Sequence, residues 1–231
     1  MTGDRLIEAI PSDPELIRSR REQIITAALR VFIEKGYHHA TTRDIARAGG
    51  FAVGTIYQYF GTKEDILYLA CQQQMAEFEE RLRVAVTQHH NALDKFRAAV
   101  YEYFRMMAEN RNIQLLYRES QSLGEEARNE IMHREDDIIG IFVQIVQEGV
   151  DQGIFKRESA SLVAYDIVLL SHVWWAKRWP VHKRFGLNEF IQAQIDILLS
   201  GICKQAEPPV PVHADRSTDG PTDGPTDKSI W

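Results

Sequence analysis

Residues 53–59 form a short stretch that presents four hydrogen-bonding side chains, from Thr55, Tyr57, Gln58 and Tyr59. None of them carries a charge, so they do not resemble the charged face that a helix usually turns to solvent. Hydroxyl and amide groups of this kind bind phosphate oxygens and base edges in DNA. A helix of this length is also too small to be a core element by itself. The stretch therefore favours a DNA-binding surface.

Charge separates this part of the chain from the remainder. The whole chain has a net charge of −6 at pH 7, but residues 16–63 contain eight basic and three acidic side chains. A basic segment on an acidic body can orient one end of a protein towards DNA phosphates, while the rest stays soluble and repels the duplex. The overall acidity therefore does not exclude DNA binding.

Two short helices joined by a glycine turn must position these side chains. Apolar residues at helical spacing predict a preceding helix that ends at Gly36. Thr41 and Asp44 form a capping-box pattern, which predicts a helix over residues 42–48. The next two residues are both glycine and supply a turn with positive φ before residues 53–59. The pattern predicts a helix-turn-helix whose last helix enters the major groove, although an ordinary αα-hairpin has a similar pattern.

The rest of the chain is helical in period almost to residue 205. Further helices are predicted over residues 63–88, 91–109, 113–123, 125–152, 159–179 and 188–204, with breaks at Gly124, Gly153, Pro180 and Gly186. The chain is thus predicted to be all-α, with a three-helix helix-turn-helix domain followed by a six-helix ligand-binding and dimerisation domain. The predicted divisions are an arm (1–14), the DNA-binding domain (15–62), the second domain (63–206) and a proline-rich disordered tail (207–231).

Composition restricts the compartment in which we expect this chain. Its two cysteines, Cys71 and Cys203, form no spaced motif. No apolar run reaches the ~18–20 residues that span a membrane, and residues 1–14 lack a secretory pattern. We expect a cytoplasmic protein with reduced thiols, no membrane association and no cofactor.

The predicted helix-turn-helix closely resembles the N-terminal signature of the TetR/AcrR family of regulators. The resemblance is carried by residues 24–32, Gly36, Tyr37, Thr41, Thr42, Ile45, Ala46, Gly50 and above all the run 53–64, Val-Gly-Thr-Ile-Tyr-Gln-Tyr-Phe-Gly-Thr-Lys-Glu. It implies a cytoplasmic, all-α homodimer that is not an enzyme. Members of this family usually repress transcription until a small ligand binds the C-terminal domain.

The resemblance also implies a role for individual residues. Thr42 and Arg43 would open the first short helix and touch a phosphate or a base edge. The residues that would face the groove are Val53, Gly54, Thr55 and Tyr57, and those that would grip phosphates are Tyr59 and Lys63. The residues expected in the core are Ile45, Ala46, Ile56 and Phe60. Arg18, Arg20 and Arg21 would either enter a minor groove or form a solvated basic arm.

The sequence departs from the family at the start of the recognition helix. The family usually has Ser or Thr at the position of Ala52, where the hydroxyl caps the helix and often binds a phosphate. Alanine can do neither, and losing such a cap costs about 0.5–2 kcal/mol. Phe51 likewise occupies a position that is usually a smaller aliphatic residue.

Ligand binding is predicted from polar and aromatic residues among apolar helices. The candidates are Phe104, Arg118, Phe142, Trp174, Trp175 and Arg178. Alternatives stay open, since Arg118 fits a surface position and the tryptophans fit a dimer interface. Residues 115–123 and 174–180 also resemble TetR-type regulators of fatty-acid and sterol catabolism, which implies an acyl-CoA effector with Arg178 or Lys177 near its phosphates. The competing effector is an aromatic drug, neutral or cationic, as in efflux-pump regulators.

The last two predicted helices are expected to form a four-helix interface with a second copy. The candidate contacts are Leu162, Leu169, Val173, Ile191, Ile195, Leu198 and Ile202. Such a homodimer would place two recognition helices about 34–36 Å apart over a palindromic operator in double-stranded DNA.

Two other function classes must be compared with this interpretation. Glu130 and His133 match the Glu-x-x-His pair of di-iron helical bundles, but no second pair is present. The adjacent pairs His38-His39 and His89-His90 make poor chelates. A bundle that binds only proteins is the third possibility, and a gel shift with the promoter of the chain's own gene separates these classes.

Overall fold

The computed structural model describes residues 13–157 and 160–204 of the 231-residue chain. Within them all regular structure is helical, as the periodicity predicts, apart from an isolated bridge between Phe155 and Cys203. The helices are α1 (Pro14–Lys35), α2 (Thr42–Gly49), α3 (Val53–Tyr59), α4 (Lys63–Thr87), α5 (Ala92–Glu109), α6 (Arg111–Glu119), the 3₁₀ turn η1 (Ser120–Ser122), α7 (Glu125–Asp151), α8 (Ala160–Ala176), α9 (Arg178–His182) and α10 (Leu187–Ile202). No described helix is long and apolar enough to cross a membrane.

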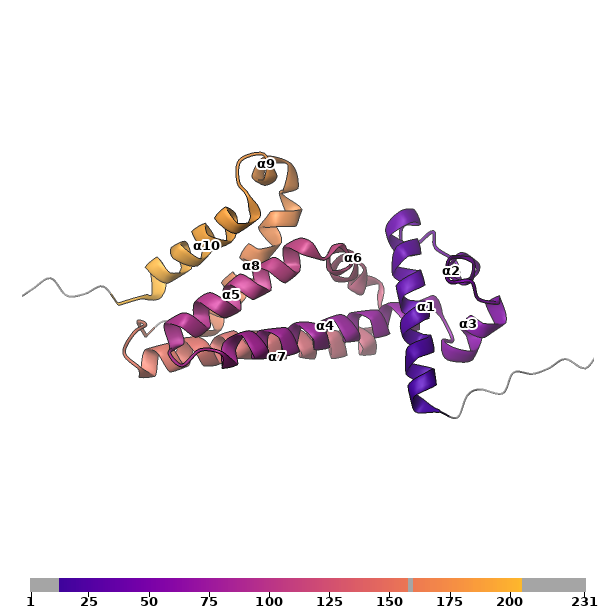
Figure 1. The fold of residues 1–231 in the computed structure, drawn as a ribbon, viewed down its shortest axis with the longest axis horizontal. Coiled ribbons are helices and arrows are strands. Elements are labelled where there is room, and N and C mark those ends of the chain that lie inside the picture. Colours follow the sequence, from indigo (N-terminus) through magenta and orange to yellow (C-terminus); the bar gives the residue numbers. More distant parts are fainter. Residues whose placement is uncertain (1–12, 158–159, 205–231) are drawn as a thin grey trace, which may run out of the picture.

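The helices form two lobes joined by α4 (Figure 1). Helices α1, α2 and α3 pack together at one end of the molecule, and α4 runs from them into the second lobe alongside α7. There α5 packs against α4, α7, α8 and α10, and α9 forms the tip above α8 and α10. Helix α6 lies between the lobes, in contact with α1 and α4.

Local signals set the ends of the first helices. Gly36 ends α1 with φ +81°, and the predicted capping box of Thr41 and Asp44 opens α2. Gly50 alone supplies the positive φ of the turn, at +72°, because Gly49 is still helical. Gly49 has a packing role, since a Cβ there would lie 2.3 Å from the Phe51 ring.

The structure corrects two predicted boundaries. The predicted arm was expected to include Pro14, but Pro14 starts α1 behind the N-cap Asp13, because proline suits the first helical position. Helix α8 ends at Ala176, and α9 follows as a separate helix that tolerates Pro180 in its first turn. The second domain therefore has seven described α-helices instead of six. Residues 1–12 of the arm and the tail 207–231 lie outside the described residues.

The hydrophobic core does not divide at the predicted boundary between residues 62 and 63. One buried cluster joins α1, α2 and α3 to the first half of α4 and to Leu115, Leu116 and Ile131 of α6 and α7. A second cluster fills the bundle of α4, α5, α7, α8 and α10, and Met75 packs against both. The helix-turn-helix thus shares its core with α6, which gives movements of that helix a mechanical route to α1.

Candidate DNA interface and ligand cavity

Helix α3 presents an exposed face at the end of the first lobe. Val53 and Tyr57 are 37% and 56% exposed, and Gly54 is also exposed, whereas Ile56 is buried and anchors the helix. A Cβ on Gly54 would meet no atom of the protein within 4 Å. Packing within the chain therefore does not require glycine at this position, and an external partner that approaches the backbone would. Thr55 and Tyr59 are half-buried at the edges of the face.

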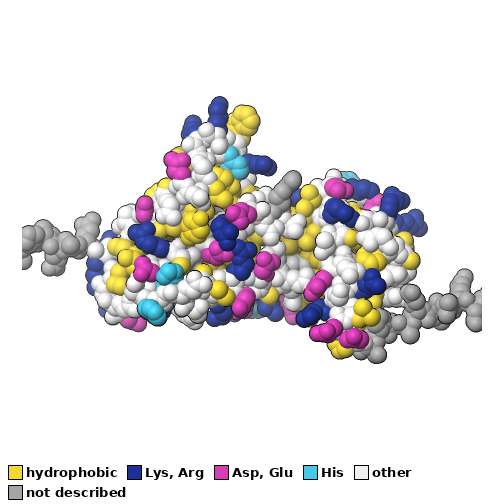
Figure 2. Space-filling view, viewed as in Figure 1, with side chains coloured by type: hydrophobic (Ala, Val, Ile, Leu, Met, Phe, Trp, Pro, Cys, Tyr) yellow, Lys and Arg dark blue, Asp and Glu magenta, His cyan; other side chains and the backbone are white. Residues whose placement is uncertain are grey.

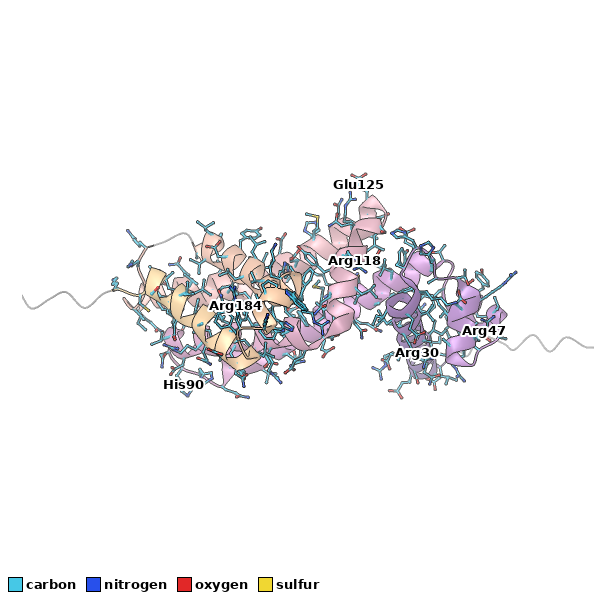
Figure 3. The ribbon with its side chains drawn as sticks, turned by 90° about the horizontal axis from the view of Figure 1, so that it is seen from above. Arg30, Arg47, His90, Arg118, Glu125 and Arg184 are labelled. Carbon is cyan, nitrogen blue, oxygen red and sulfur yellow. The ribbon has the colours of Figure 1, made fainter. Side chains whose placement is uncertain are left out.

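Helices α2 and α3 meet through their predicted DNA-contacting residues. The hydroxyls of Thr42 and Tyr57 lie 3.0 Å apart and share a hydrogen bond. This bond brings the N-terminus of α2 beside the exposed face of α3. Arg43 is exposed at the same end, and Figure 3 shows Arg47 at the extremity of this lobe, remote from the bundle. Hydrogen-bonding and basic groups from both helices thus converge on one surface, where Figure 2 shows several Lys and Arg side chains.

Lys63 starts α4, as predicted, and its ammonium is bound within the chain. Its ammonium donates to the backbone carbonyls of Tyr37, His38 and Ala40 at 2.8, 3.2 and 3.2 Å, and it lies 4.6 Å from the centre of the Tyr37 ring. An ammonium has three N–H donors, so all of them are engaged within the chain. The structure thus gives Lys63 an internal role, tying α4 to the turn after α1, and its phosphate contact stays a prediction.

The N-terminus of α2 has a side-chain cap, whereas the N-terminus of α3 has none. Hydrogen bonds from Lys35 and Thr41 lower the pKa of Asp44 to about 2, so its carboxylate is ionised at neutral pH. Ala52, the N-cap of α3, makes no side-chain hydrogen bond, as predicted. Phe51 packs on the core, and the Arg20 guanidinium lies 5.9 Å from the centre of its ring.

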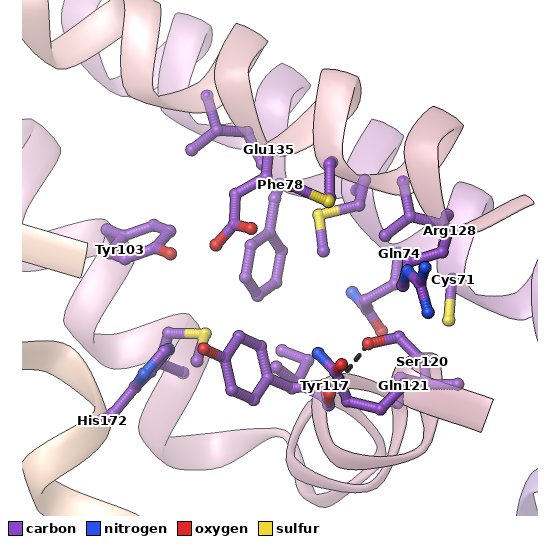
Figure 4. A pocket seen from close by; sticks show the side chains of 17 residues that line it. Cys71, Gln74, Phe78, Tyr103, Tyr117, Ser120, Gln121, Arg128, Glu135 and His172 are labelled. Carbon is purple, nitrogen blue, oxygen red and sulfur yellow. Dashed lines mark hydrogen bonds between the residues drawn. The ribbon is translucent and has the colours of Figure 1, made fainter. Parts of the chain in front are cut away.

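A cavity of about 360 Å³ lies between α4, α5, α6, α7 and α8 (Figure 4). This volume lies at the small end of the range of about 300–1,000 Å³ that is usual for ligand pockets. The apolar lining residues are Cys71, Met75, Phe78, Met107, Ile113, Leu116, Ile131, Met132 and Ile138. The polar lining residues are Gln74, Tyr103, Tyr117, Ser120, Gln121, Arg128, Glu135 and His172. The cavity can therefore enclose a mainly apolar group with a few directional polar contacts.

Burial changes the ionisation of the polar groups at one end of this cavity. It raises the pKa of Glu135, to which the neighbouring charge of Asp136 adds, and lowers the pKa of His172. It also raises the pKa of Tyr103 and Tyr117, and the charge of Glu135 raises both further. The imidazole and both phenols are therefore neutral near pH 7.

None of the six predicted ligand-binding residues lines this cavity. Phe104 and Phe142 are buried in the bundle core, and Trp174 stacks on His182 and Phe190, with ring centres 4.0 and 5.3 Å away. Arg118 is exposed and donates to Glu119, and Arg178 lies on the exposed α9 tip. Trp175 comes nearest, because its ring packs 5.5 Å from that of His172 and 6.2 Å from that of Tyr117.

Sequence reasoning missed the polar lining because it comes from separate helices. Glu135 lies within the charged run Arg-Glu-Asp-Asp, which is typical of a solvated face. A signal was present in α7, where Arg128, Ile131, Met132, Glu135 and Ile138 follow one helical face. Two ionisable residues on an otherwise apolar stripe indicate a cavity or a buried partner.

The predicted dimer contacts divide into two groups. Ile191, Ile195, Leu198 and Ile202 of α10 are buried in the core of the same chain, so they cannot be the interface. Val173 is half-buried against that core. Leu162 and Leu169 are each 61% exposed, and Tyr165 and Ile197 add further exposed apolar surface on α8 and α10.

Contacts between α6 and the first lobe connect the cavity to the helix-turn-helix. Tyr117 and Ser120 line the cavity, and Glu119 between them is buried with its carboxylate 3.5 Å from the imidazole of His38. Glu64 at the start of α4 accepts a hydrogen bond of 2.6 Å from the amide of Gly124, which precedes α7. A ligand that displaces α6 would therefore act on the turn between α1 and α2.

Glu130 of the Glu-x-x-His pair makes contacts between helices in the structure. Glu130 accepts hydrogen bonds from Tyr68 and Gln72 of α4. Within the described part of the chain, no three His, Cys, Asp or Glu side chains cluster closely enough to hold a metal ion. Glu130 thus fastens α7 to α4.

Two family models match this chain. Residues 24–68 match the bacterial regulatory proteins of the tetR family, and residues 89–202 match the tetracyclin repressor-like C-terminal domain. Together they cover more than half of the sequence and both lobes of the structure.

Relatives match over almost their whole lengths. The regulator HbdR of Aromatoleum sp. (strain CIB) is 29% identical over 86% of this chain and 87% of its own length. The fatty acid metabolism regulator protein of Bacillus subtilis is 29% identical over 80% of this chain and 96% of its own length. A crystal structure of the transcriptional regulator FadR from Bacillus subtilis in complex with stearoyl-CoA superposes with a TM-score of 0.67, at 27% identity, covering 78% of this chain and 98% of that one.

Proposed function

Because the chain belongs to the TetR family of bacterial regulatory proteins, which are DNA-binding transcriptional regulators and not enzymes, we propose that it is a homodimeric repressor released from its operator by an acyl-CoA thioester. The observation that carries this proposal is the mainly apolar cavity whose wall, α6, also contacts the turn between α1 and α2. A ligand in that cavity would then lower the affinity of α3 for DNA through a movement of α6.

The proposed DNA contacts are exposed or half-buried residues of α2 and α3. They are Thr42, Arg43, Val53, Gly54, Thr55, Tyr57 and Tyr59. A major groove about 12 Å wide admits one helix, and the open backbone at Gly54 allows α3 to approach the base edges closely. Arg43 and Tyr59 would position the lobe on phosphates, which gives affinity that falls with salt.

The proposed dimer interface is the exposed apolar face of α8 and α10. Tyr165 and Leu169 lie four residues apart on α8, which places them on one helical face. Ile197 of α10 is 60% exposed although its neighbours Leu198 and Leu199 are buried. Pairing this face with its symmetry mate would form a four-helix interface and set two α3 helices about 34–36 Å apart on a palindromic operator.

The acyl-CoA effector is supported by the chemistry of the cavity and by the relatives. Methionine, phenylalanine and aliphatic side chains supply eight of the seventeen lining residues, which suits an acyl group. A whole thioester exceeds a cavity of about 360 Å³, so the acyl part would lie inside and the nucleotide outside. One relative of similar length carries fatty acid metabolism in its name, and the FadR structure holds stearoyl-CoA.

A drug-like cation is the second candidate effector, and one observation favours it. Glu135 makes no hydrogen bond or ion pair with another described residue, and aromatic rings share its cavity. A carboxylate among aromatic faces attracts a lipophilic cation.

Calorimetry and gel shifts with the purified full-length chain separate the two candidates. Acyl-CoA thioesters of several chain lengths should bind the protein and release it from the promoter of its own gene. Absence of binding by every thioester, together with operator release by a drug-like cation, would overturn the acyl-CoA proposal.

A further inference from the structure

The two ends of the cavity differ in polarity. Arg128, Gln74 and Gln121 gather at one end, and Glu135 projects into the other end, near Tyr103 and His172 (Figure 4). Arg128 and Glu135 lie seven residues apart on α7, which is about 10 Å along a helix axis. Apolar side chains such as Phe78 occupy the space between them.

Solvent reaches the end with Arg128. Gln121 is exposed and Arg128 is half-buried, whereas Tyr103 at the opposite end is only 4% exposed. The Arg128 guanidinium makes no hydrogen bond or ion pair with another described residue, and it is the only Lys or Arg side chain in the lining that the structure describes. An anionic thioester would therefore place its charged part beside Arg128, and its acyl chain would run towards Glu135.

Polar groups gather at the opposite end, and one of them, the carboxyl of Glu135, has no side-chain hydrogen bond to a described residue. The Glu135 carboxyl has no described hydrogen-bond partner, and the rings of Tyr117 and His172 pack 4.5 Å apart beside it. Glu135 is half-buried, so a ligand that fills the cavity would cover its carboxyl, and leaving that group covered without a partner costs about 1–3 kcal/mol. A plain alkyl terminus would incur this cost, whereas a hydroxyl or carbonyl oxygen would avoid it.

We propose that the cavity selects acyl groups that carry an oxygen substituent, a hydroxyl or a carbonyl, at the end remote from the thioester, and that Glu135 is the residue that recognises it, with Tyr103 and His172 beside it. This inference rests on the proposed acyl-CoA effector. It makes Glu135 a specificity-determining residue and Arg128 the residue that sets the direction of the chain.

The surroundings of Glu135 favour an oxygen substituent over a cation. Burial raises the pKa of this carboxyl, so its neutral form is favoured relative to an exposed glutamate, and a neutral carboxyl can both donate and accept. Burial also favours the neutral form of His172, whose ring nitrogens can donate or accept. A cation would also share the cavity with the Arg128 guanidinium, which repels it.

Matched ligand pairs test the inference on the full-length protein. Plain and ω-hydroxylated acyl-CoA thioesters from six to twelve carbons are titrated by calorimetry, alongside an alkyltrimethylammonium ion of similar length. The variants are Glu135→Leu, which removes both polar atoms of the carboxyl, and Glu135→Gln, which keeps a donor and an acceptor. Asp137→Leu is the control, because Asp137 is exposed on the same helix and does not line the cavity.

The wild type should bind at least one hydroxylated thioester about tenfold or more tighter than its plain partner, as one buried hydrogen bond predicts. Glu135→Leu should lose this preference while binding the plain thioester as well or better, a split that a merely structural role would not produce. Glu135→Gln should retain part of the preference, and Asp137→Leu all of it. Thermal unfolding verifies that each variant is folded.

Three results would overturn the inference. Equal affinity for both members of every pair removes the role of Glu135 but leaves the acyl-CoA proposal intact. Failure of every thioester to bind rejects that proposal as well. Tighter binding of the ammonium ion than of any thioester, lost in Glu135→Leu, assigns the carboxylate to a cation site instead.

Discussion

The carboxylate of Glu119 lies 3.5 Å from the imidazole Nε2 of His38, and this contact joins the wall of the cavity to the turn between α1 and α2. Glu119 is only 7% exposed and lies two residues after Tyr117, which lines the cavity. His38 carries one of the carbonyls that hold Lys63 at the start of α4. A shift of α6 would therefore act on the turn that precedes α2.

His38→Ala should reduce the response of operator binding to the effector by about two- to fivefold. The contact between His38 and Glu119 is exposed on the histidine side, and exposed ion pairs contribute up to about 1 kcal/mol. Operator affinity without effector should change little. Gel shifts with and without the effector give both values. His39→Ala is the control because His39 is exposed and adjacent, and an equal loss in both variants would contradict a specific role for the pair.

Gly54→Ala should weaken operator binding by about tenfold or more, that is, by about 1.4 kcal/mol or more, because a methyl group would separate α3 from the groove. Stability should be unchanged or rise by up to about 1 kcal/mol, since alanine is the better helix former and its Cβ meets nothing in the chain. Gly140→Ala makes the same change in α7, where a Cβ also meets nothing within 4 Å. Gly140→Ala should change stability by a similar amount and leave operator affinity unaltered. Weaker operator binding in both variants would contradict a specific role for Gly54 at the groove.

Ala52→Ser should stabilise the chain by about 0.5–2 kcal/mol, because it supplies the side-chain cap that α3 lacks. Denaturant unfolding measures the gain, and operator affinity should rise or stay constant. Thr41→Ala removes an existing cap and should act in the opposite direction. An unchanged melting temperature together with unchanged operator affinity in Ala52→Ser would count against the prediction.

Leu169→Arg and Ile197→Arg should each convert the proposed dimer into monomers, because they place unpaired charges in an apolar interface. Light scattering after gel filtration gives the mass directly, and operator affinity should fall with dimerisation. Val84 of α4 is also exposed, at 47%, so Val84→Arg adds the same charge elsewhere and should stay dimeric. Dimers that persist in both α8 and α10 variants would require another interface.

The stability of the first lobe should fall in acid through Asp44. Its pKa is lowered from 3.8 to about 2 by the hydrogen bonds from Lys35 and Thr41, so its contribution is fully present above about pH 4 and is lost as the pH falls towards 2. Urea unfolding of the wild type and Asp44→Asn should differ most near neutral pH and converge near pH 2. A difference that does not depend on pH would show that the carboxylate charge is not responsible.

Short-range patterns predicted most of the first lobe. The capping box of Thr41 and Asp44, the helix-ending Gly36 and the uncapped Ala52 all involve residues within a few positions of one another. Their geometry follows from local backbone preferences and hydrogen bonds, which do not depend on the rest of the chain. The same holds for the exposed face of α3, because its one buried residue, Ile56, is set by helical spacing.

Lys63 and α10 show where such reasoning stops. The local sequence places Lys63 at a helix start, but only the fold brings the carbonyls of Tyr37, His38 and Ala40 within reach of its ammonium. Likewise, periodicity groups Ile191, Ile195, Leu198 and Ile202 on one face of α10, yet it cannot say whether the same chain or a second copy covers that face. The structure buries them in their own bundle.

By itself, the sequence determined the all-helical class, the ends of most helices in the first lobe, the basic recognition unit and the family. Only the tertiary structure decided which residues form the cavity. Tyr103, Glu135 and His172 come from α5, α7 and α8, and their meeting depends on how those helices pack. Helix ends are determined by groups a few residues apart, whereas a cavity is the space that side chains from distant segments leave unfilled, so it depends on the packing of the whole bundle.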